Sequence, residues 1–448
     1  PGDTRTDLSG EIFSTVPYHS HNVYISGGNQ EFSNRAYFEY SDRQGTLINN
    51  YTPTVTVRLN SMWKLNKYIR IREDVTWQAT KTRGPNPYSA ESGVILAALI
   101  MPRNAEVYAA DGSYGGTASS DQAYIEKDGS NYADIHGDAI NPVRILKSAY
   151  NKNDKTTFTS STVLEITEPI KGLNFTSRFT YKQINYFERY FNTRRLEQGK
   201  PLDKNDLKYT SYRQPEWNFE NTVNYDRVFG AHNVGLMAST TSNESSYRWV
   251  RASARDFESE EEALMYFAQA GTYDNSEDKE WKDRNVSVVG RVSYSYADRY
   301  FVTGSWRRDY AGRLPKGEKF GDFPSVTAAW KISSEPFFPK NRILNVLKVR
   351  ASWGRIGNLG SIKRGYGYPA LEKYQIGSGD VGVQVGYDTP LLIGMYNKTG
   401  YNPFLTWETS EQLDLGLDAT FFNNRLSLTF DYFKKKTMDL IKEQDAGW

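Results

Sequence analysis

The sequence predicts an all-β protein, specifically an antiparallel transmembrane β-barrel of which the chain carries about fourteen strands. Three observations lead to this expectation. Apolar and polar residues alternate with a period of two, very short connections alternate with very long ones, and aromatic residues are abundant although the mean hydropathy is low. Together they are typical of a wall with an apolar outer face, a polar lumen and long loops.

Composition narrows the class of protein. Aromatic residues make up 14% of the 448 residues, yet hydrophobic residues reach only 38% and the mean hydropathy is −0.67. A barrel has this profile, and a secreted or periplasmic β-rich protein would share it. Lys and Arg number 55 against 53 Asp and Glu, so charge gives no case for nucleic-acid binding. Cysteine is absent, and no apolar stretch reaches the roughly 18 residues of a transmembrane helix.

The period of two is clearest near the end of the chain. Over 413–421, leucine, alanine and phenylalanine occupy the odd positions, while aspartate, glycine and threonine occupy the even ones. Asn423 and Asn424 follow, and the alternation resumes over 426–432. Two alternating runs joined by a short Asn-rich turn predict a β-hairpin. The pattern recurs over 55–65, 69–79, 173–181, 286–296 and 300–306, and Glu73 interrupts it by falling on an apolar face.

The connections fall into two lengths. Short turns are expected at 66–67, 229–231, 297–299 and 423–424, and long loops over roughly 84–154, 255–284 and 356–404. Short turns at one end and long loops at the other are typical of a transmembrane barrel, with periplasmic turns and extracellular loops. Periodicity alone also fits a soluble sandwich, but the loop asymmetry and the number of strands favour the barrel. Short helices are expected inside the loops, over 259–268 and 91–101.

Several segments, in order along nearly the whole chain, resemble the barrel of the SusC/RagA family of TonB-dependent transporters. The block over 307–336 resembles the family's RxDGSSRF…FPSxSxxWxIxxEP signature, with Tyr310, Ala311 and Gly312 where Gly-Ser-Ser is usual. The TDL…IF segment over 6–13 has Leu8 where Trp is usual. The other matching segments are 23–29, 34–47, 57–60, 350–358 and 402–440.

The resemblance implies a barrel of about 22 strands with an internal plug, in the outer membrane of a Gram-negative, Bacteroidetes-like cell. It implies nutrient import without enzymatic activity. A SusD-like surface lipoprotein would close over the mouth and trap an oligosaccharide or a peptide, and TonB would act through an N-terminal part missing here. Residues 1–448 are expected to be one partial barrel domain, without signal peptide, N-terminal extension, plug and last strands. Outer-membrane lipid and lipopolysaccharide would surround it.

Two other functions stay open at this point. A siderophore or cobalamin receptor would share the barrel, but the ordered SusC-type motifs and the His-poor loops argue against it. A soluble β-rich protein that binds or hydrolyses carbohydrate would present paired carboxylates on adjacent strands, and none stands out. Glycan and peptide importers share the barrel motifs and differ in their loops, so the sequence leaves the substrate open.

Aromatic residues of the expected loops are the candidates for ligand contact, because sugars and peptides stack on aromatic faces. They are Tyr88, Tyr108, Tyr114, Trp249, Tyr273, Trp281, Tyr366 and Tyr368. Packing of the loops against each other or against a partner lid is the alternative interpretation. By contrast, Trp63, Trp77 and Trp306 fall on apolar faces and are predicted to belong to the aromatic girdles at the membrane surface.

The sequence predicts no catalytic site and no cofactor, with calcium in a loop as the only candidate metal. His19 and His21 would share one face of a strand, but polar loop residues are the simpler interpretation. The acidic segment over 274–283 offers oxygen ligands for calcium, yet it lacks the residue order of an EF-hand, so a solvated loop is favoured. The lysines of 434–436 end a strand at the extracellular interface, where they would contact lipopolysaccharide phosphates or remain solvated.

Overall fold

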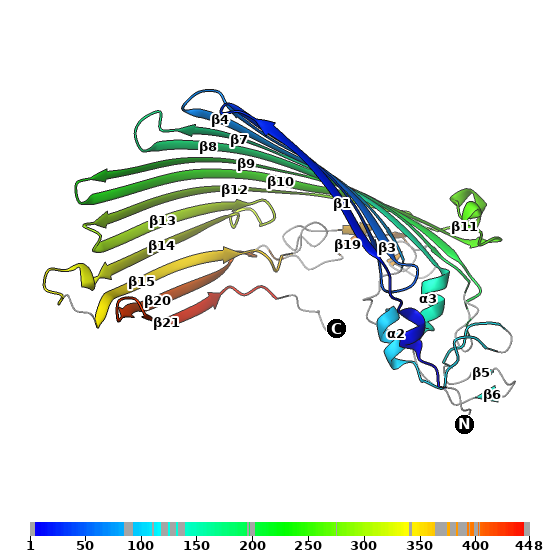
Figure 1. The fold of residues 1–448 in the computed structure, drawn as a ribbon. Coiled ribbons are helices and arrows are strands. Elements are labelled where there is room, and N and C mark those ends of the chain that lie inside the picture. Colours follow the sequence, from blue (N-terminus) through cyan, green and yellow to red (C-terminus); the bar gives the residue numbers. More distant parts are fainter. Residues whose placement is uncertain are drawn as a thin grey trace.

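One large curved sheet dominates the computed structural model (Figure 1). The structure describes residues 5–84, 93–109, 112–117, 124–125, 131–132, 139–194, 197, 202–274, 276–339, 343–362, 374–376, 382–383, 392–393, 395–397, 402 and 404–442.

The sheet has 15 strands, and fourteen of them follow each other in the order β1-β2-β3-β4-β7-β8-β9-β10-β12-β13-β14-β15-β20-β21, with β11 paired to β10. The first are β1 (Tyr18–Gly28), β2 (Phe32–Gln44), β3 (Tyr51–Lys64), β4 (Ile69–Arg83), β7 (Ala149–Thr167), β8 (Leu173–Asn192), β9 (Asp206–Phe229) and β10 (His232–Phe257). The others are β11 (Ala270–Tyr273), β12 (Glu277–Tyr296), β13 (Tyr300–Ala311), β14 (Phe320–Lys331), β15 (Leu344–Asn358), β20 (Glu408–Phe421) and β21 (Leu426–Met438). The prediction of about fourteen antiparallel strands is confirmed.

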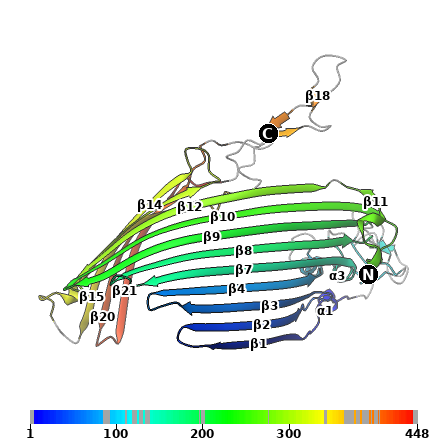
Figure 2. The same cartoon turned by 90° about the horizontal axis from the view of Figure 1, so that it is seen from above.

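Among the described strands, β1 and β21 form the two edges of the sheet, which is open between them (Figures 1 and 2). Three short hairpins lie outside it: β5 (Tyr124–Ile125) with β6 (Asn131–Tyr132), β16 (Tyr374–Ile376) with β19 (Met395–Asn397), and β17 (Gly382–Val383) with β18 (Leu392–Ile393). The helices are α1 (Leu8–Ile12), α2 (Val94–Ile100) and α3 (Pro142–Ser148), with 3₁₀ turns η1 (Glu262–Leu264), η2 (Phe267–Gln269) and η3 (Ile332–Ser334). In the described part of the chain, no helix has the length and apolarity needed to cross a bilayer.

The two faces of the sheet differ in polarity, because side chains of a strand alternate between them. Phe38 of β2 pairs with Val57 of β3, and both lie on a face that carries exposed large hydrophobic residues. Their neighbours Glu39 and Arg58 lie on the other face. Register therefore defines an apolar face and a polar face across the whole sheet.

Turn chemistry fixes the short connections at one end of the sheet, here called the short-turn end. The Asn66 side chain accepts hydrogen bonds from the backbone of Tyr68 at 2.8 Å and of Ile69 at 2.9 Å. Asn423 and Asn424 adopt φ of 55° and 65°, a left-handed conformation that asparagine tolerates better than most residues. Both turns were predicted, the first as a short connection between two alternating runs and the second from its asparagines.

The loops at the opposite end, here called the long-loop end, are shorter than expected because the strands are longer. β9 has 24 residues and β10 has 26. β7 begins at Ala149 and β12 at Glu277, inside segments expected to be loops. The helix expected over 91–101 is confirmed by α2, but the helix expected over 259–268 is wrong. Two 3₁₀ turns occur there, because Ser259 accepts a hydrogen bond from the backbone of Glu261, two residues on, instead of capping an α-helix.

The apolar face provides a direct test of the fold. Phe219 of β9 lies on this face and contacts Phe179 edge to face, with ring centroids 6.4 Å apart, whereas its neighbour Asn218 lies on the polar face. We expect Phe219→Arg in the full-length protein to lower the free energy of unfolding in lipid by about 2–4 kcal/mol, because a charge would face hydrocarbon. Asn218→Arg is the control and should change it little. Equal losses for the two variants would refute the assignment of the faces.

Candidate functional site

Loops at the long-loop end fold into a small body, here called the loop platform and defined as residues 5–14, 45–50, 93–109, 112–117, 139–148, 193–194 and 197. It contains the three α-helices (Figure 1). Its apolar core is formed by fully or almost fully buried side chains from several of these segments: Leu8, Ile12, Leu47, Val94, Met101, Ala105, Ala139, Val143 and Leu146. A single-layered wall has no interior of its own, so the platform is where this region of the chain gains a buried core.

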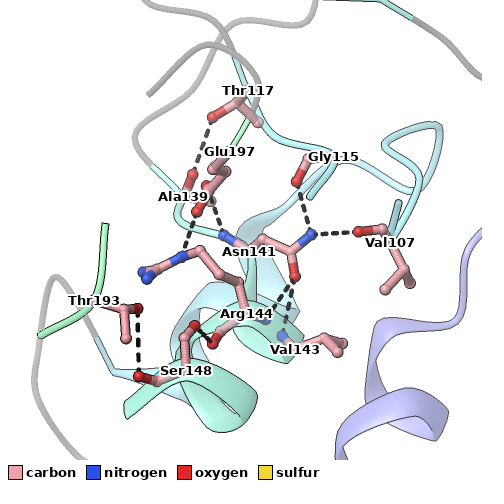
Figure 3. Close-up of polar contacts among 10 residues, drawn as sticks. All are labelled: Val107, Gly115, Thr117, Ala139, Asn141, Val143, Arg144, Ser148, Thr193 and Glu197. Carbon is pink, nitrogen blue, oxygen red and sulfur yellow. Dashed lines mark hydrogen bonds and ion pairs between the residues drawn. The ribbon is translucent and has the colours of Figure 1, made fainter. Parts of the chain in front are cut away.

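Asn141 is the polar centre of the loop platform (Figure 3). Its side-chain nitrogen donates to the carbonyl oxygens of Val107 at 3.1 Å and Gly115 at 2.7 Å. Its side-chain oxygen accepts from the backbone nitrogens of Val143 at 3.0 Å and Arg144 at 3.2 Å, which caps α3. One amide thus joins the start of a helix to two turns of a neighbouring loop.

A buried ion pair completes this network. The Arg144 Nε donates to Glu197 Oε2 at 2.7 Å, and the side chains are 9% and 0% exposed. Glu197 Oε1 also accepts from the backbone nitrogen of Asn141 at 2.9 Å. A buried ion pair contributes little net stability when desolvation is counted, but losing one partner is costly. The pair therefore fixes which arrangement of the loops is allowed.

Tyr108 and Tyr114 lie together on the loop platform, with ring centroids 5.2 Å apart. Lys147 of α3 donates to the Tyr108 hydroxyl at 2.8 Å, and this hydrogen bond raises the pKa of the Lys147 ammonium. Burial raises the pKa of the Tyr114 hydroxyl. Tyr108 is 41% exposed, whereas Tyr114 packs against the platform core. Tyr108 is therefore accessible and Tyr114 packs beneath it, while their contact with a ligand stays a prediction.

A second buried cluster lies where the loop over 258–269 folds onto β8, β9 and β10. Its core comprises Phe191, Leu207, Ala254, Phe257 and Met265. Asn205 closes it by accepting from the backbone nitrogen of Phe257 at 2.8 Å and donating to the Phe257 carbonyl at 3.0 Å.

A contact between Lys152 and Glu262 holds the start of η1 to β7. Lys152 hydrogen-bonds the Glu262 carboxylate and lowers its pKa below the ordinary value.

A third cluster joins the connections beyond β13, β15 and before β20, and its core comprises Ala311, Leu314, Ile362 and Leu405. Arg313 forms a buried ion pair with Asp283 at 3.0 Å and donates to the carbonyl of Ile362 at 3.1 Å. Over the residues that the structure describes, the loops at the long-loop end are therefore anchored in three places, each by an apolar core and by hydrogen bonds or an ion pair of a polar side chain.

The five predicted ligand-contact aromatics that the structure describes do not form one site. Tyr108 and Tyr114 meet on the loop platform, and Tyr273 lies on β11, 65% exposed, with its hydroxyl donating to the carbonyl of Phe267 at 3.0 Å. Trp249 and Trp281 were expected in loops, and this is wrong: they lie on strands β10 and β12. Tyr88, Tyr366 and Tyr368 lie outside the described residues.

The expectations about the membrane girdle and the charged segments have mixed outcomes. Trp63, Trp77 and Trp306 all lie on the apolar face, 37%, 40% and 43% exposed, and their role at the membrane surface stays a prediction. The acidic segment over 274–283 was expected to be a loop, which is wrong from Glu277 onward. Glu277 begins β12, so the carboxylates of residues 277–283 are distributed over the two faces of a strand.

The metal expectations concern His19 and the acidic segment. His19 and His21 lie on strand β1, so their interpretation as loop residues is wrong. Their ring centroids are 6.3 Å apart, and His19 Nε2 lies 4.0 Å from Asp42 Oδ2. Over the described residues, no group of three or more His, Cys, Asp or Glu side chains could hold a metal ion. Calcium in a loop stays an untested prediction.

The fold and the loop platform define a class: the wall and surface loops of a large outer-membrane receptor barrel. Residues 102–447 match the family described as TonB dependent receptor-like, beta-barrel, and the chain belongs to that family. The protein is the barrel region of an outer-membrane TonB-dependent receptor of the SusC/RagA type, as the sequence motifs predicted. The apolar face therefore faces lipid and the polar face lines the lumen.

Two curated relatives and two solved structures show the likeness. The chain is 26% identical to TonB-dependent receptor P3 of Formosa agariphila, over 98% of this chain and 42% of the relative. It is 23% identical to TonB-dependent receptor SusC of Bacteroides thetaiotaomicron, over 98% and 43%. The RagAB peptide transporter matches with a TM-score of 0.74 at 21% identity, over 97% of this chain and 46% of that one. The FpvAI–pyocin S2 complex matches with a TM-score of 0.52 at 12% identity, over 94% and 46%.

At sequence identities of 21% and 12%, the two solved structures support the fold and nothing further. The chain spans less than half the length of the relatives it matches.

The sequence analysis missed Asn141, Arg144 and Glu197. A signal for Asn141 was present, because Asn followed by Pro142 is a common helix start, with the cap at Asn and proline in the first turn. Glu197 gives no local signal, since its partners lie 53 and 56 residues away in the chain.

Removing the amide of Asn141 tests the loop platform. We expect Asn141→Ala to lower the local free energy of unfolding of the platform by about 2–4 kcal/mol, because α3 loses its cap and two carbonyls lose their donor. Hydrogen exchange over 139–148 in the full-length protein would measure this. Asn66→Ala, at the short-turn end, is the control and should leave exchange in the platform unchanged. Unchanged exchange in Asn141→Ala would contradict the role of Asn141.

The Lys152–Glu262 contact predicts acid sensitivity of the second cluster. The folded-state pKa of Glu262 lies below its ordinary value of 4.5, so the contact contributes fully above 4.5 and is lost as the pH falls through the lower folded value. We expect hydrogen exchange over 258–269, corrected for intrinsic rates, to rise in that acid range. Lys152→Met should remove this pH dependence. Acid loosening of the same size in Lys152→Met would show that another group is responsible.

Proposed function

We propose that the full-length protein imports a large nutrient, an oligosaccharide or a peptide, across the outer membrane. A SusD-like surface lipoprotein would close over the long-loop end, and TonB would supply work through the N-terminal part of the full-length protein. The observation that carries the proposal is the loop platform, whose buried Asn141–Arg144–Glu197 network makes a preordered rim. A preordered surface loses less conformational entropy when it binds a ligand or a lid.

The relatives support this proposal by their descriptions. SusC is described as a TonB-dependent receptor, and RagAB as a peptide transporter. The family is one of receptors rather than enzymes, which agrees with import without catalysis. A wide barrel must also be closed inside to avoid leakage, so uptake through it needs external work, which agrees with a TonB-dependent process.

An exposed apolar patch on α2 supports the lipoprotein lid. Leu96, Leu99 and Ile100 of α2 are 41%, 71% and 52% exposed, although α2 belongs to the loop platform and packs on its buried core. Neighbouring Val94 and Ala97 are buried on the opposite side of the helix. Adjoining exposed apolar side chains on an ordered helix are typical of a surface that a partner covers. We assign this patch to the lid.

The lysines near the end of β21 support contact with lipopolysaccharide. Lys434 and Lys436 pair in register with Leu413 and Glu411, on the face that meets lipid and at its extracellular margin. Lysine reaches from this level toward anionic head groups while its aliphatic part stays against the apolar surface.

The import proposal is tested by fractionating cells that express the full-length protein and by affinity purification from the outer-membrane fraction. We expect a surface lipoprotein to co-purify, and deletion of the receptor gene to abolish growth on one glycan or peptide source. Release of the receptor without detergent, or normal growth of the deletion strain on every glycan and peptide source tested, would overturn the proposal.

The α2 patch gives a sharper test. We expect Leu99→Asp combined with Ile100→Asp to reduce the recovery of the lipoprotein about tenfold or more, because two charges would face an apolar contact. Leu264→Asp is a matched control, since Leu264 is also an exposed leucine, 40% exposed, in a different loop. Equal recovery of the lipoprotein with the double variant and with the control would show that the lipoprotein does not bind this patch.

A further inference from the structure

Four aromatic rings form a continuous row across four adjacent strands, here called the aromatic ladder: Tyr186 of β8, Tyr212 of β9, Tyr247 of β10 and Trp281 of β12. Ring centroids lie 4.7 Å apart between Tyr186 and Tyr212, with planes at 20°. The next two distances are 5.2 Å, with planes at 36°, and 5.8 Å, with planes at 19°.

The aromatic ladder lies on the lumen side of the wall. Phe179 and Phe219, at odd positions of β8 and β9, lie on the lipid face, so Tyr186 and Tyr212, at even positions, lie on the other. On β10 and β12 the parity is reversed. Leu236 is paired with Val292 on the lipid face, which places Tyr247 and Trp281 toward the lumen.

The ladder stands toward the long-loop end. Spanning a bilayer takes about 9–11 residues of a tilted strand, whereas β9 and β10 have 24 and 26. The surplus extends toward the long-loop end, and Tyr212 lies six residues from the start of β9, at that end. The ladder therefore lines the upper lumen, on the path that any ligand entering from outside must take.

The geometry of the rings determines what they can offer. Centroid distances close to the spacing of neighbouring strands mean that the rings stack on each other along the sheet and stand on edge. Tyrosine hydroxyls lie at the far edge of each ring, so Tyr186, Tyr212 and Tyr247 present a row of polar groups, in which the Tyr186 hydroxyl already donates a hydrogen bond to the Glu188 carboxylate and keeps its capacity to accept one. Trp281 lies beyond the last β12–β13 pair, Asn285 with Ala311, so β13 places no residue opposite it.

Trp249 adjoins the ladder on β10, two residues beyond Tyr247 toward the long-loop end. It pairs in register with Tyr212 on one side and Lys279 on the other. The Arg251 guanidinium lies 4.7 Å and the Lys279 ammonium 5.4 Å from its ring centroid. Because cations already occupy this indole, its part is to hold charged neighbours in place rather than to receive a ligand.

The side chains around the ladder carry no surplus of positive charge, and the Glu188 carboxylate lies near both Tyr186 and Tyr212. Basic side chains on the lumen side of these strands lie beside acidic ones, so no excess of cations is available for an anionic ligand. Two uncharged polar side chains lie nearby. Gln214 Nε2 donates to Glu216 Oε1 at 2.8 Å, and Ser245 Oγ donates to the same oxygen at 2.9 Å. The ion pairs are Lys182–Glu216, Lys208–Asp206 and Lys279–Glu277, with N–O distances of 3.9, 3.1 and 3.5 Å.

We propose that the aromatic ladder is a ligand-contact surface built into the barrel wall, for a neutral, polyhydroxylated chain, that is, an uncharged glycan. Sugar rings would stack at Trp281, and sugar hydroxyls would exchange hydrogen bonds with the tyrosine row. The inference rests on the proposed import function and narrows its substrate from an oligosaccharide or a peptide to the former. It also moves part of the recognition from the loops to the wall.

A purely structural ladder is the competing explanation, because cross-strand aromatic pairs stabilise a sheet by themselves. Two variants separate the explanations. Tyr212→Phe with Tyr247→Phe keeps the stacked rings and removes the hydroxyls, while Trp281→Ala removes the terminal ring. The matched control is Phe179→Ala with Phe219→Ala, an aromatic pair on the lipid face of the same sheet.

Binding is measured by calorimetry on the full-length protein in detergent. The probes are linear neutral oligosaccharides of glucose, xylose and mannose, an oligoalginate as the anionic probe, and a tryptic digest of casein as the peptide probe. Thermal unfolding of each variant is recorded in parallel, so that loss of fold is recognised separately.

We expect a neutral oligosaccharide to bind, and Trp281→Ala and the double Phe variant each to weaken binding about tenfold, the effect of one lost stacking contact or of two lost hydrogen bonds. The control should keep wild-type affinity. Wild-type affinity in both ladder variants, or binding of the oligoalginate or the peptides alone, would overturn the proposal, as would no binding of any probe.

Failure of the import function gives a different result. A strain that lacks the receptor would then grow normally on every nutrient tested, while the purified protein still binds the oligosaccharide through the ladder. Growth and calorimetry therefore test the two proposals separately.

Discussion

Antiparallel pairing in a fixed register is the constraint on which the rest of the structure depends. Inside a bilayer no water is available to backbone groups, so every strand must find its hydrogen bonds in its neighbours. Since side chains alternate strictly along a strand, the same pairing decides which residues meet lipid and which meet the lumen. Phe219 and Tyr212 are seven residues apart on β9, and register alone gives one to the lipid face and the other to the aromatic ladder.

The same constraint explains the exception at Glu73. This residue lies on the lipid face of β4, where a lone carboxylate would be costly. Its oxygens accept hydrogen bonds from Ser160, at 2.7 Å, and from Thr162 of the neighbouring strand, while Ser61 pairs with it on the other side. Two hydroxyl groups of β7 thus satisfy the two carboxylate oxygens, and the small Ser61 of β3 leaves room beside them. The sequence placed Glu73 on the apolar face but gave no reason, because its partners lie on another strand.

Much of the wall could be predicted from the sequence, because alternation and Asn-rich turns are local signals. Prediction failed where a strand leaves the bilayer and its pattern becomes charged on both faces. The acidic segment from Glu277 looks like a loop by composition, yet cross-strand ion pairs hold it in β12, as Glu244 shows with Lys282 at 3.2 Å and with Arg284. The register of the strands brings these ion-pair partners together from distant positions in the sequence, so no local pattern reveals them.

The candidate site was predicted less well than the wall for the same reason. Asn141 had a local signal in the following proline, but Glu197 is defined only by what the folded loops bring to it. The aromatic ladder is an intermediate case, because each ring follows the alternation of its own strand and only the register aligns them. Its residues belong to strands that exceed the thickness of a bilayer, and extra strand length must serve something other than crossing lipid. In this protein it raises a rigid, polar wall toward the loop platform. Under the two proposals made above, recognition would be shared between loops that receive a lid and a wall that presents fixed groups to the ligand.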